Sequence, residues 1–267
     1  MILRYTLSPI SKVNNEDKTL LQVLQKEFNG KLDLAIEIFT GKYHRLFLQQ
    51  LISSQLDIDR LDYLKRDSFY TGVTEGNINT DRILSVMNVE NEQLVFESKG
   101  IHSLEKFLLA RRLMYWQVYL HKTGLVAENM LVFVLKRAKE LAEDGVLLYA
   151  STALKYFLNN KISEANFDNE TLEMFSKLDD YDIVAAMKSW IDHKDVVLSN
   201  LSSMIINRNL LKVKLTRDEV SDEKFLKLQQ KTKEKYGLSD HEVNYFVYKS
   251  TVSNQAYDSS NEGIKIL

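Results

Sequence analysis

The chain has 267 residues, of which 45% are hydrophobic and 27% are charged. This length and composition allow one sizeable core, or one core with a small additional domain. The formal net charge of -2 excludes a globally basic surface of the kind that binds nucleic acid or an anionic membrane. Any binding of phosphate must therefore depend on local positive charge, and we expect no specific nucleic-acid partner.

Cysteine is absent, which excludes a disulfide framework and a thiolate metal site and indicates a reducing compartment. The N-terminal stretch is too polar for a secretory signal, and no stretch reaches the roughly 18 consecutive apolar residues of a membrane span. We therefore expect a cytoplasmic protein with no membrane partner. A single proline and nine glycines, among many Leu, Lys and Glu residues, predict long helices.

The N-terminal third predicts several short helices. A helix capped by Asn15 or Asp17 is expected to end at Gly30, where glycine favours a C-terminal stop. A second covers residues 32–39. A third begins near His44 and breaks near residue 53; the histidine itself is expected at the surface rather than as a metal ligand.

The stretch 53–72, SSQLDIDRLDYLKRDSFYTG, has the most distinctive pattern. At about 100° per residue, Asp59, Tyr63 and Asp67 fall on one helix face, with Arg60 at its edge, and the leucines point away. Carboxylates on such a face can hold a hard metal ion, and the arginine can hold a phosphate. The stretch predicts a helix with a chemical face and a core face.

Two other interpretations of this stretch compete. A mixed-charge face is most often solvated, with Asp62 and Arg66 forming an i,i+4 pair worth a few tenths of a kcal/mol. Four aspartates in eleven residues nevertheless exceed what helix propensity favours. An EF-hand loop starting at Asp57 is excluded, because Asp62 stands where glycine is required and Ser68 stands where glutamate is required.

Residues 103–121 predict a second informative helix, capped by Ser103. Arg111, Tyr115 and Tyr119 fall on one of its faces. From the residues alone, this face is best explained as an aromatic core stripe with a snorkelling arginine.

The other segments before residue 208 are predicted from periodicity and caps. The acidic turn 179–182 is expected to cap a helix rather than bind metal. His193 and His241 have no paired ligand spacing and are expected to be structural. The predicted elements are a loop over 73–81, a short helix over 82–87, a strand over 92–97, and helices over 126–142, 147–158, 169–178, 183–192 and 196–206.

From residue 209 the composition changes. Residues 211–215 and 242–250 alternate like strands on either side of a charged helix over 222–236, and 261–267 reads as a strand with an unpaired edge. We therefore predict a mostly α fold, with a helical domain over residues 1–208 and a small α+β element over 209–267.

The run LDIDRLDYLKRDSFYTGV resembles the segment that carries the last metal-ligand aspartate of HD-domain phosphohydrolases. The similarity is to the branch that includes the deoxynucleoside triphosphate triphosphohydrolases, and it implies an HD-type helical core. By position, it implies that Asp59 is a metal ligand, that Arg60 contacts substrate phosphate, and that Tyr63 and Asp67 contact the sugar. The implied reaction hydrolyses a deoxynucleoside triphosphate to deoxynucleoside and triphosphate.

The pattern R-x-x-x-Y-x-x-x-Y-x-H-K over residues 111–122 resembles the second substrate helix of that family. It implies that Arg111 binds substrate phosphate and that Tyr119 packs beside the nucleotide. Tyr115 stands where some relatives have a histidine, so no acid–base role is implied there.

The same resemblance implies regulation. His121 and Lys122 match a pair that binds a regulatory nucleotide phosphate in relatives, and Arg82 lies near the place of an arginine that serves such a site at a subunit interface. We therefore expect a homo-oligomer.

Members of that family also supply a histidine and an adjacent His-Asp pair, which together with the last aspartate hold Mg, Mn or Fe. No His-Asp dipeptide occurs in this sequence, and only His44 precedes Asp59. One carboxylate does not make a catalytic metal site, which needs several protein ligands and an open position. We therefore expect no complete catalytic set in this chain alone, and further ligands encoded elsewhere.

Two hypotheses follow. The first is a phosphohydrolase whose front half, with the remaining metal ligands, lies elsewhere: it is either lost from this gene or supplied by another chain. This hypothesis predicts metal-dependent nucleotide hydrolysis only when a polypeptide with those ligands is added. The second is a non-catalytic nucleotide-binding or assembly module, which predicts nucleotide binding that an Asp59→Ala substitution spares.

Overall fold

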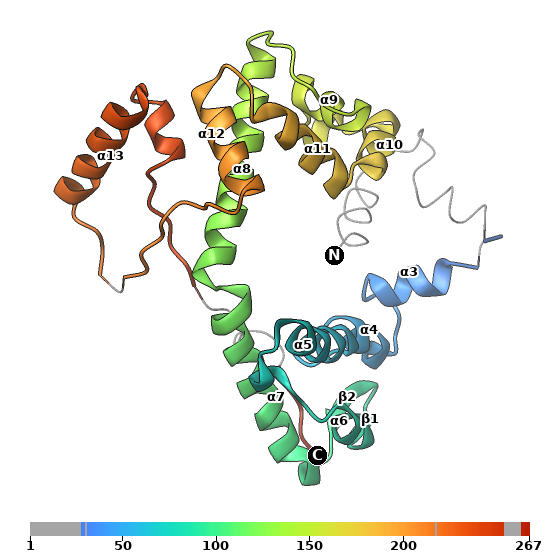
Figure 1. Cartoon of the computed structure of the whole chain (residues 1–267). Helices are drawn as coiled ribbons and strands as arrows, with labels where there is room; N and C mark the ends of the chain where they lie inside the picture. The colour runs from blue at the N-terminus through green and yellow to red at the C-terminus, as the bar shows by residue number, and fades with distance from the viewer. Residues whose placement is uncertain (1–27, 30, 217, 254–262) are drawn as a thin grey trace. The chain divides into compact units, whose positions relative to one another are not determined.

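The chain divides into two compact units (Figure 1). Unit 1 contains the described residues up to His121 and those from Val252 onward, and unit 2 contains Lys122 to Thr251. The boundary predicted after residue 208 falls inside unit 2. The computed structural model describes residues 28–29, 31–216, 218–253 and 263–267, so the helix predicted to start near Asn15 or Asp17 lies outside the described residues.

Unit 1 is mostly helical and contains one small hairpin. Its core is built from leucines of α5 and apolar side chains of α6 and α7, including Leu64, Ile83 and Phe107, each fully buried. Its elements are α3 (Asp33–Phe39), α4 (Leu46–Ile52), α5 (Ile58–Thr71), η2 (Thr74–Gly76), α6 (Thr80–Ser85), β1 (Met87–Glu90), β2 (Gln93–Phe96), η3 (Ser98–Gly100), α7 (Ile101–Met114) and the π-helix η4 (Tyr115–Tyr119).

The sheet of unit 1 gains a strand-like partner from the end of the chain. β1 and β2 are antiparallel, with Met87 opposite Phe96. On the other edge of β2, the Phe96 N–H donates to the Lys265 carbonyl at 2.9 Å, and the Leu267 N–H donates to the Phe96 carbonyl at 2.9 Å. The described part of the predicted terminal strand, residues 263–267, therefore has a partner, and Ile266 forms a parallel bridge with Phe96.

Unit 2 is a bundle of helices around a second core. Trp190, Val197 and Leu201 are buried at its centre, and the Trp190 indole N–H donates to the Tyr149 carbonyl at 2.9 Å. Its elements are α8 (Lys122–Glu143), α9 (Thr152–Asn159), η5 (Glu164–Asn166), α10 (Asn169–Lys177), α11 (Asp180–Trp190), α12 (Val196–Ile206), α13 (Asp222–Tyr236) and η6 (Glu242–Tyr245).

Side-chain caps set most helix starts in unit 2. Asp179 accepts from the N–H groups of Tyr181 and Asp182, and the Asp182 carboxylate accepts from the Asp179 N–H in return. This reciprocal capping satisfies free donors of the first turn. The acidic turn 179–182 is therefore a helix cap, as the sequence predicted. Ser151, Asp168 and Asp195 cap α9, α10 and α12.

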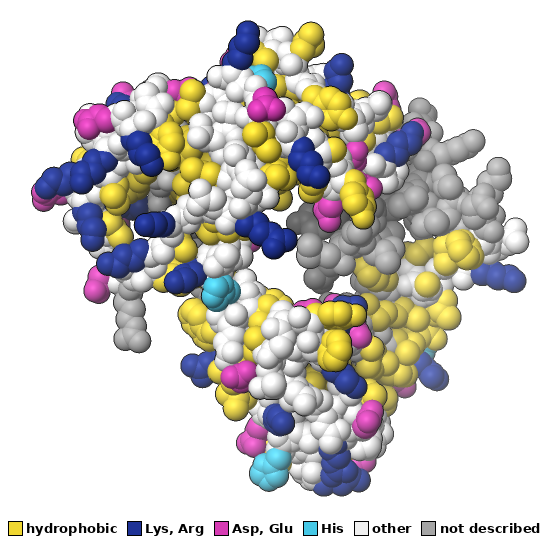
Figure 2. All heavy atoms as spheres, viewed as in Figure 1, with side chains coloured by type: hydrophobic (Ala, Val, Ile, Leu, Met, Phe, Trp, Pro, Cys, Tyr) yellow, Lys and Arg dark blue, Asp and Glu magenta, His cyan; other side chains and the backbone are white. Residues whose placement is uncertain are grey.

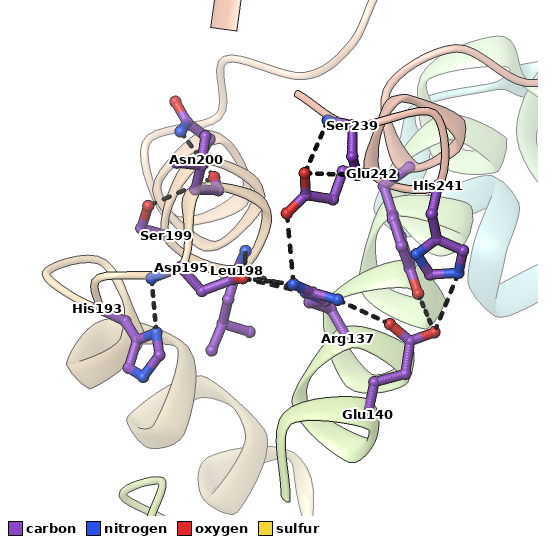
Figure 3. Close-up of polar contacts among 12 residues, drawn as sticks. Arg137, Glu140, His193, Asp195, Leu198, Ser199, Asn200, Ser239, His241 and Glu242 are labelled. Carbon is purple, nitrogen blue, oxygen red and sulfur yellow. Dashed lines mark hydrogen bonds and ion pairs between the residues drawn. The ribbon is translucent and has the colours of Figure 1, made fainter. Parts of the chain in front are cut away.

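A charge cluster joins three elements of unit 2, and Figure 3 shows it in close-up. Arg137 of α8 donates to Asp195 at 2.6 Å, to Glu140 at 3.1 Å and to Glu242 at 3.5 Å. Its side chain is 15% exposed. The Tyr245 hydroxyl donates to the Glu140 carboxylate. Three carboxylates from α8, the α12 cap and η6 therefore converge on one guanidinium; we call this group the Arg137 cluster.

The helix α13 is rich in lysine. Figure 2 shows dark-blue side chains gathered over this helix, which carries Lys224, Lys227, Lys231 and Lys235. Lys227 pairs with Glu223 at 3.4 Å. The lysine side chain is 75% exposed and the glutamate side chain is 83% exposed. Exposed pairs of this kind belong to a solvated helix face and contribute little to stability.

The mostly α prediction is confirmed, but several local predictions are wrong. Residues 211–215 are extended without a ladder partner in the described part of the chain, and 242–250 begins with η6. Alternating hydrophobicity does not supply a paired neighbour, so the predicted strand, helix, strand order does not form. The strand β1 was missed because its residues follow a short helical pattern. Ser103, predicted as a helix cap, lies inside α7.

The described residues include no single helix whose length and apolar composition suffice for crossing a membrane. The bent pair of Ser98–Tyr119 with Lys122–Glu143 passes that test only when its two helices are taken together.

Candidate active site

A capped turn starts α5. The Asp57 Oδ1 accepts from the Arg60 N–H at 2.7 Å, and its Oδ2 accepts from the Ser54 N–H at 3.1 Å. An aspartate at a helix N-cap satisfies free backbone donors and interacts favourably with the helix dipole. Asp57 is only 2% exposed. A carboxylate buried to this extent needs a positive partner.

Arg60 is that partner. Its Nη1 donates to the Asp57 carboxylate and to the Ser54 carbonyl. Its Nε is buried and has no hydrogen-bond partner among the described residues. One edge of this guanidinium is therefore fixed to the turn, while the Nε donor is free to bind a further acceptor.

Arg111 of α7 is held differently. It is 5% exposed, and its Nη1 donates to the Gln55 carbonyl at 3.3 Å and to the Gln55 side-chain oxygen at 3.4 Å. Both acceptors are neutral. Its Nε is also buried and lacks a hydrogen-bond partner within the described ranges. Because transfer of an unpaired cation into a protein interior is costly, a guanidinium in this state favours an incoming anion.

Three tyrosines pack against one another near Arg111, whose guanidinium carbon lies 6.0 Å from the centroid of the Tyr115 ring. The Tyr63 and Tyr119 rings lie 6.0 Å apart at 77°, and the Tyr115 and Tyr119 rings lie 5.3 Å apart at 79°. These are edge-to-face contacts, which aromatic pairs favour. The Tyr119 hydroxyl donates to the Asp67 carboxylate at 2.8 Å. Residues predicted from two separate stretches of sequence are therefore brought together.

The backbone that carries these tyrosines is a π-helix. Residues 103–121 were predicted as one continuous helix, but η4 interrupts it, and the Leu120 N–H donates to the Tyr115 carbonyl at 2.7 Å. Short π-helical turns of this kind are often found at functional sites. The wider turn brings Tyr115 and Tyr119 into ring contact.

The hydroxyls of Tyr63 and Tyr119 stay protonated at neutral pH, because the pKa of each is raised. Burial and the hydrogen bond to Asp67 raise the pKa of Tyr119 well above its usual value of 10. Burial also raises the pKa of Tyr63. The cluster thus combines two guanidiniums and two protonated hydroxyls with two carboxylates: Asp57 pairs with Arg60, and Asp67 accepts from Tyr119.

The remaining predicted metal ligand is isolated. Asp59 is exposed on α5 and has no ion-pair partner in the described part of the chain. No group of three His, Asp or Glu side chains suited to a metal ion occurs among the described residues. His44 is exposed, and its ring lies 4.4 Å from the Tyr43 ring. Asp59 alone is therefore an insufficient ligand set for a divalent metal.

The residues implied in regulation lie outside this cluster. Arg82 is in the last turn of α6, and its Nη2 donates to the Lys99 carbonyl at 3.3 Å. His121 ends unit 1, and Lys122 begins α8; both are exposed. Their regulatory role stays a prediction.

Sequence reasoning missed two members of the site, Gln55 and Asp57, which hold the arginines. Asp57 carried a usable signal, because an aspartate directly before the first apolar helical residue predicts an N-cap. Gln55 carried none, because its contact with Arg111 joins residues 56 positions apart.

The sequence matches a known protein family over a region that carries α7. Residues 78–239, more than half of the chain, match the family described as the HD associated region. The chain belongs to the HD-associated family. The matched residues include α7 and the π-helix but begin after α5, so the stretch 53–72 lies outside them.

The chain is also similar to solved and curated proteins of related sequence. The crystal structure of a phosphohydrolase from Bacteroides thetaiotaomicron is 47% identical, with a TM-score of 0.89, over 99% of this chain and 67% of that one. An uncharacterized protein, YwfO, from Bacillus subtilis is 37% identical over 73% of this chain and 43% of its own length. The chain spans about half the length of the curated relatives it matches.

One further relative bears a substrate name. The deoxynucleoside triphosphate triphosphohydrolase SAMHD1 homolog of Dictyostelium discoideum is 30% identical over 100 residues, which are 35% of this chain and 19% of that protein. The HD-type resemblance of the fold is thus confirmed, whereas the triphosphohydrolase branch rests on this partial similarity.

Proposed function

We propose that this chain carries the substrate-binding part of an HD-superfamily phosphohydrolase that hydrolyses deoxynucleoside triphosphates to deoxynucleoside and triphosphate. The observation that carries the proposal is the pair of arginines, Arg60 and Arg111, whose buried Nε donors have no partner among the described residues. Guanidinium groups with free donors bind phosphate oxygens through charge-assisted hydrogen bonds.

The two arginines would bind the triphosphate. Arg111 is paired only with neutral oxygens, so its charge is available to an anion. Arg60 shares its charge with Asp57, but its buried Nε is a directed donor without a partner in the described part of the chain. During hydrolysis, water adds to the α-phosphorus, the bond to the 5′ oxygen breaks, and the deoxynucleoside leaves with a proton on that oxygen. Fixed cations in a water-poor site stabilise the negative charge that develops on the phosphate oxygens.

The tyrosine side of the cluster would bind the nucleoside. The Tyr63 and Tyr119 rings supply apolar surface for a sugar or base. Asp67 accepts from Tyr119 through one oxygen, so its other oxygen is able to accept from a sugar hydroxyl. These roles agree with those implied by the resemblance of residues 53–72 and 111–122.

The family implies a divalent metal, Mg, Mn or Fe, but the described residues do not fit one. Asp59 is an exposed carboxylate, and it belongs to no group of three or more His, Asp or Glu side chains suited to a metal in the described part of the chain. A catalytic metal needs several protein ligands. The chain's own residues therefore account for binding and orientation of substrate, and hydrolysis requires ligands in addition to Asp59.

A second candidate function has one observation in its favour. The isolation of Asp59 suits a nucleotide-binding or assembly module that performs no chemistry. In that case, nucleotide binding would not need metal, and Asp59→Ala would leave it unchanged.

Calorimetric titration of the full chain with each of the four deoxynucleoside triphosphates tests both candidates. The enzyme proposal predicts binding, together with metal-dependent release of triphosphate once a polypeptide bearing the His and His-Asp ligands is added, and loss of that release in Asp59→Ala. Binding without release under any metal would favour the module. Absence of binding to all four nucleotides would refute both.

A further inference from the structure

Both arginines of the candidate site are fastened to one short turn, residues 54–57. Arg60 reaches the turn from α5, where it binds the Ser54 carbonyl and the Asp57 carboxylate. Arg111 reaches it from α7, where it binds Gln55 twice. The turn is therefore the common support of two cations that are distant in sequence.

Asp57 is the residue that shapes this turn. Its Oδ1 accepts from the Arg60 N–H and caps α5, while its Oδ2 accepts from the Ser54 N–H and from the Arg60 guanidinium. At 2% exposure, the carboxylate is shielded from water. Hydrogen bonds to an ionised acceptor in such surroundings are stronger and more directional than neutral ones.

We propose that Asp57 is a positioning residue: it fixes the Arg60 guanidinium so that the free Nε is presented to a substrate phosphate. This inference rests on the proposed function, since it assumes that Arg60 binds phosphate. Asp57 itself does not touch the substrate. A long arginine side chain loses considerable rotamer entropy on binding, and a partner that fixes it beforehand reduces that cost.

Electrostatics alone predicts the opposite effect of Asp57. A carboxylate beside a cation weakens the attraction of that cation for an anion, so neutralising the carboxylate should tighten anion binding. Positioning predicts that neutralising it weakens binding. The sign of the change therefore discriminates between the two roles.

The test is calorimetric titration of the full chain with inorganic triphosphate. Asp57→Asn keeps a side-chain oxygen for the helix cap but removes the charge, and we expect the dissociation constant to rise about tenfold, since a hydrogen bond to a charged group is lost. Asp57→Ser, which keeps a capping hydroxyl but cannot reach the guanidinium, should weaken binding similarly. Asp62→Asn is the matched control, because Asp62 is an exposed carboxylate on the same helix, paired with Arg66 at 3.1 Å.

A double-mutant comparison separates positioning from a general structural effect. In an Arg60→Ala background, the Asp57→Asn change should no longer weaken triphosphate binding, because no guanidinium is left to position. Thermal unfolding identifies variants that fold, and the serine variant replaces the asparagine variant if the latter does not.

The outcomes are distinct. Weaker binding in Asp57→Asn that disappears without Arg60 supports the inference. Equal or tighter binding, or the same weakening in the Arg60→Ala background, overturns it while the proposed function stands. Failure of the unchanged chain to bind triphosphate overturns the proposed function, and the inference with it.

Discussion

The two units each bury arginine, but they satisfy it in opposite ways. In unit 2, Arg137 is bound by three carboxylates, and its acceptors come from three different elements (Figure 3). In unit 1, Arg111 is more deeply buried yet binds only the neutral oxygens of Gln55. Arg60 has one carboxylate partner, Asp57, and a buried Nε without a partner among the described residues.

This difference separates a structural cation from a binding one. The guanidinium of the Arg137 cluster is saturated with negative charge, so it joins α8, α12 and η6 and has nothing to offer a ligand. The unit 1 arginines have hydrogen-bond donors and positive charge that the fold does not satisfy. This lowers the stability of the fold and favours the binding of an anion. Burial alone does not identify a site; the charge of the partners does.

The sharpest test of the structural role is Arg137→Met. Removing the guanidinium leaves the Asp195 and Glu140 carboxylates without their buried partner, so we expect the free energy of unfolding to fall by about 3 kcal/mol. Urea denaturation followed by circular dichroism measures it. Lys177→Met breaks an exposed pair with Glu173 and should cost less than about 1 kcal/mol. If the two variants lose equal stability, the Arg137 cluster is not a structural joint.

The converse substitution is Arg111→Met. Because its acceptors are neutral, its loss should cost the fold less than the loss of Arg137, whereas affinity for triphosphate should fall by about tenfold or more. Calorimetry and urea denaturation together measure both effects. Arg112→Met, at the exposed neighbouring position of α7, is the control and should retain affinity. Unchanged affinity in Arg111→Met would contradict the contrast between the two units.

A smaller effect is expected from Tyr119→Phe. The substitution removes the hydroxyl that donates to Asp67 and should cost about 1 kcal/mol of stability. We expect a few-fold weaker binding of a deoxynucleoside triphosphate and unchanged binding of inorganic triphosphate, because Tyr119 lies on the nucleoside side. Tyr70→Phe, at an exposed tyrosine of α5, serves as the control. Equal losses for both ligands would assign Tyr119 to phosphate binding instead.

The smallest effect is the pH dependence of unit 2. Burial alone would raise the pKa of Asp195, but the hydrogen bond from Arg137 and the backbone bond from Leu198 outweigh it, so the pKa is lowered. A carboxyl with a lower pKa in the folded state stabilises fully above the pKa of about 4 of the unfolded chain, and this stability is lost as pH falls through the folded value. Thermal unfolding between pH 7 and pH 2 should show a steeper decline in the unchanged chain than in Asp195→Asn. Parallel curves would mean that Asp195 contributes no such linkage.

The sequence predicted elements best where local signals decide them. The bounds of α12 and α13 agree with the structure: Asp195 caps the start of α12, and Gly237 in the left-handed conformation ends α13. The β1 strand and the unpaired segment 211–215 were misjudged, because strand formation depends on a partner elsewhere in the chain.

The site was predicted in part for a similar reason. Helical periodicity placed Tyr63 and Asp67 on one face of α5, and the structure brings Tyr119 to them. The π-helix that sets the orientation of Tyr119 leaves no mark in the apolar pattern. The support of Arg111 by Gln55 depends on how α7 packs near the start of α5, which no local pattern encodes.

The end of the chain returns to pair with β2, and this affects how far unit 2 can vary in length. Unit 1 leaves off at His121 and resumes at Val252, so unit 2 is an insertion whose two ends both join unit 1. While unit 2 is unfolded and flexible, the entropy cost of closing this segment grows only with the logarithm of its length, by about 0.6 kcal/mol for each doubling. Segments added to or removed from unit 2 therefore change the closure cost of the Phe96 and Ile266 pairing very little, and the inserted unit is free to vary in size while the sheet edge stays covered.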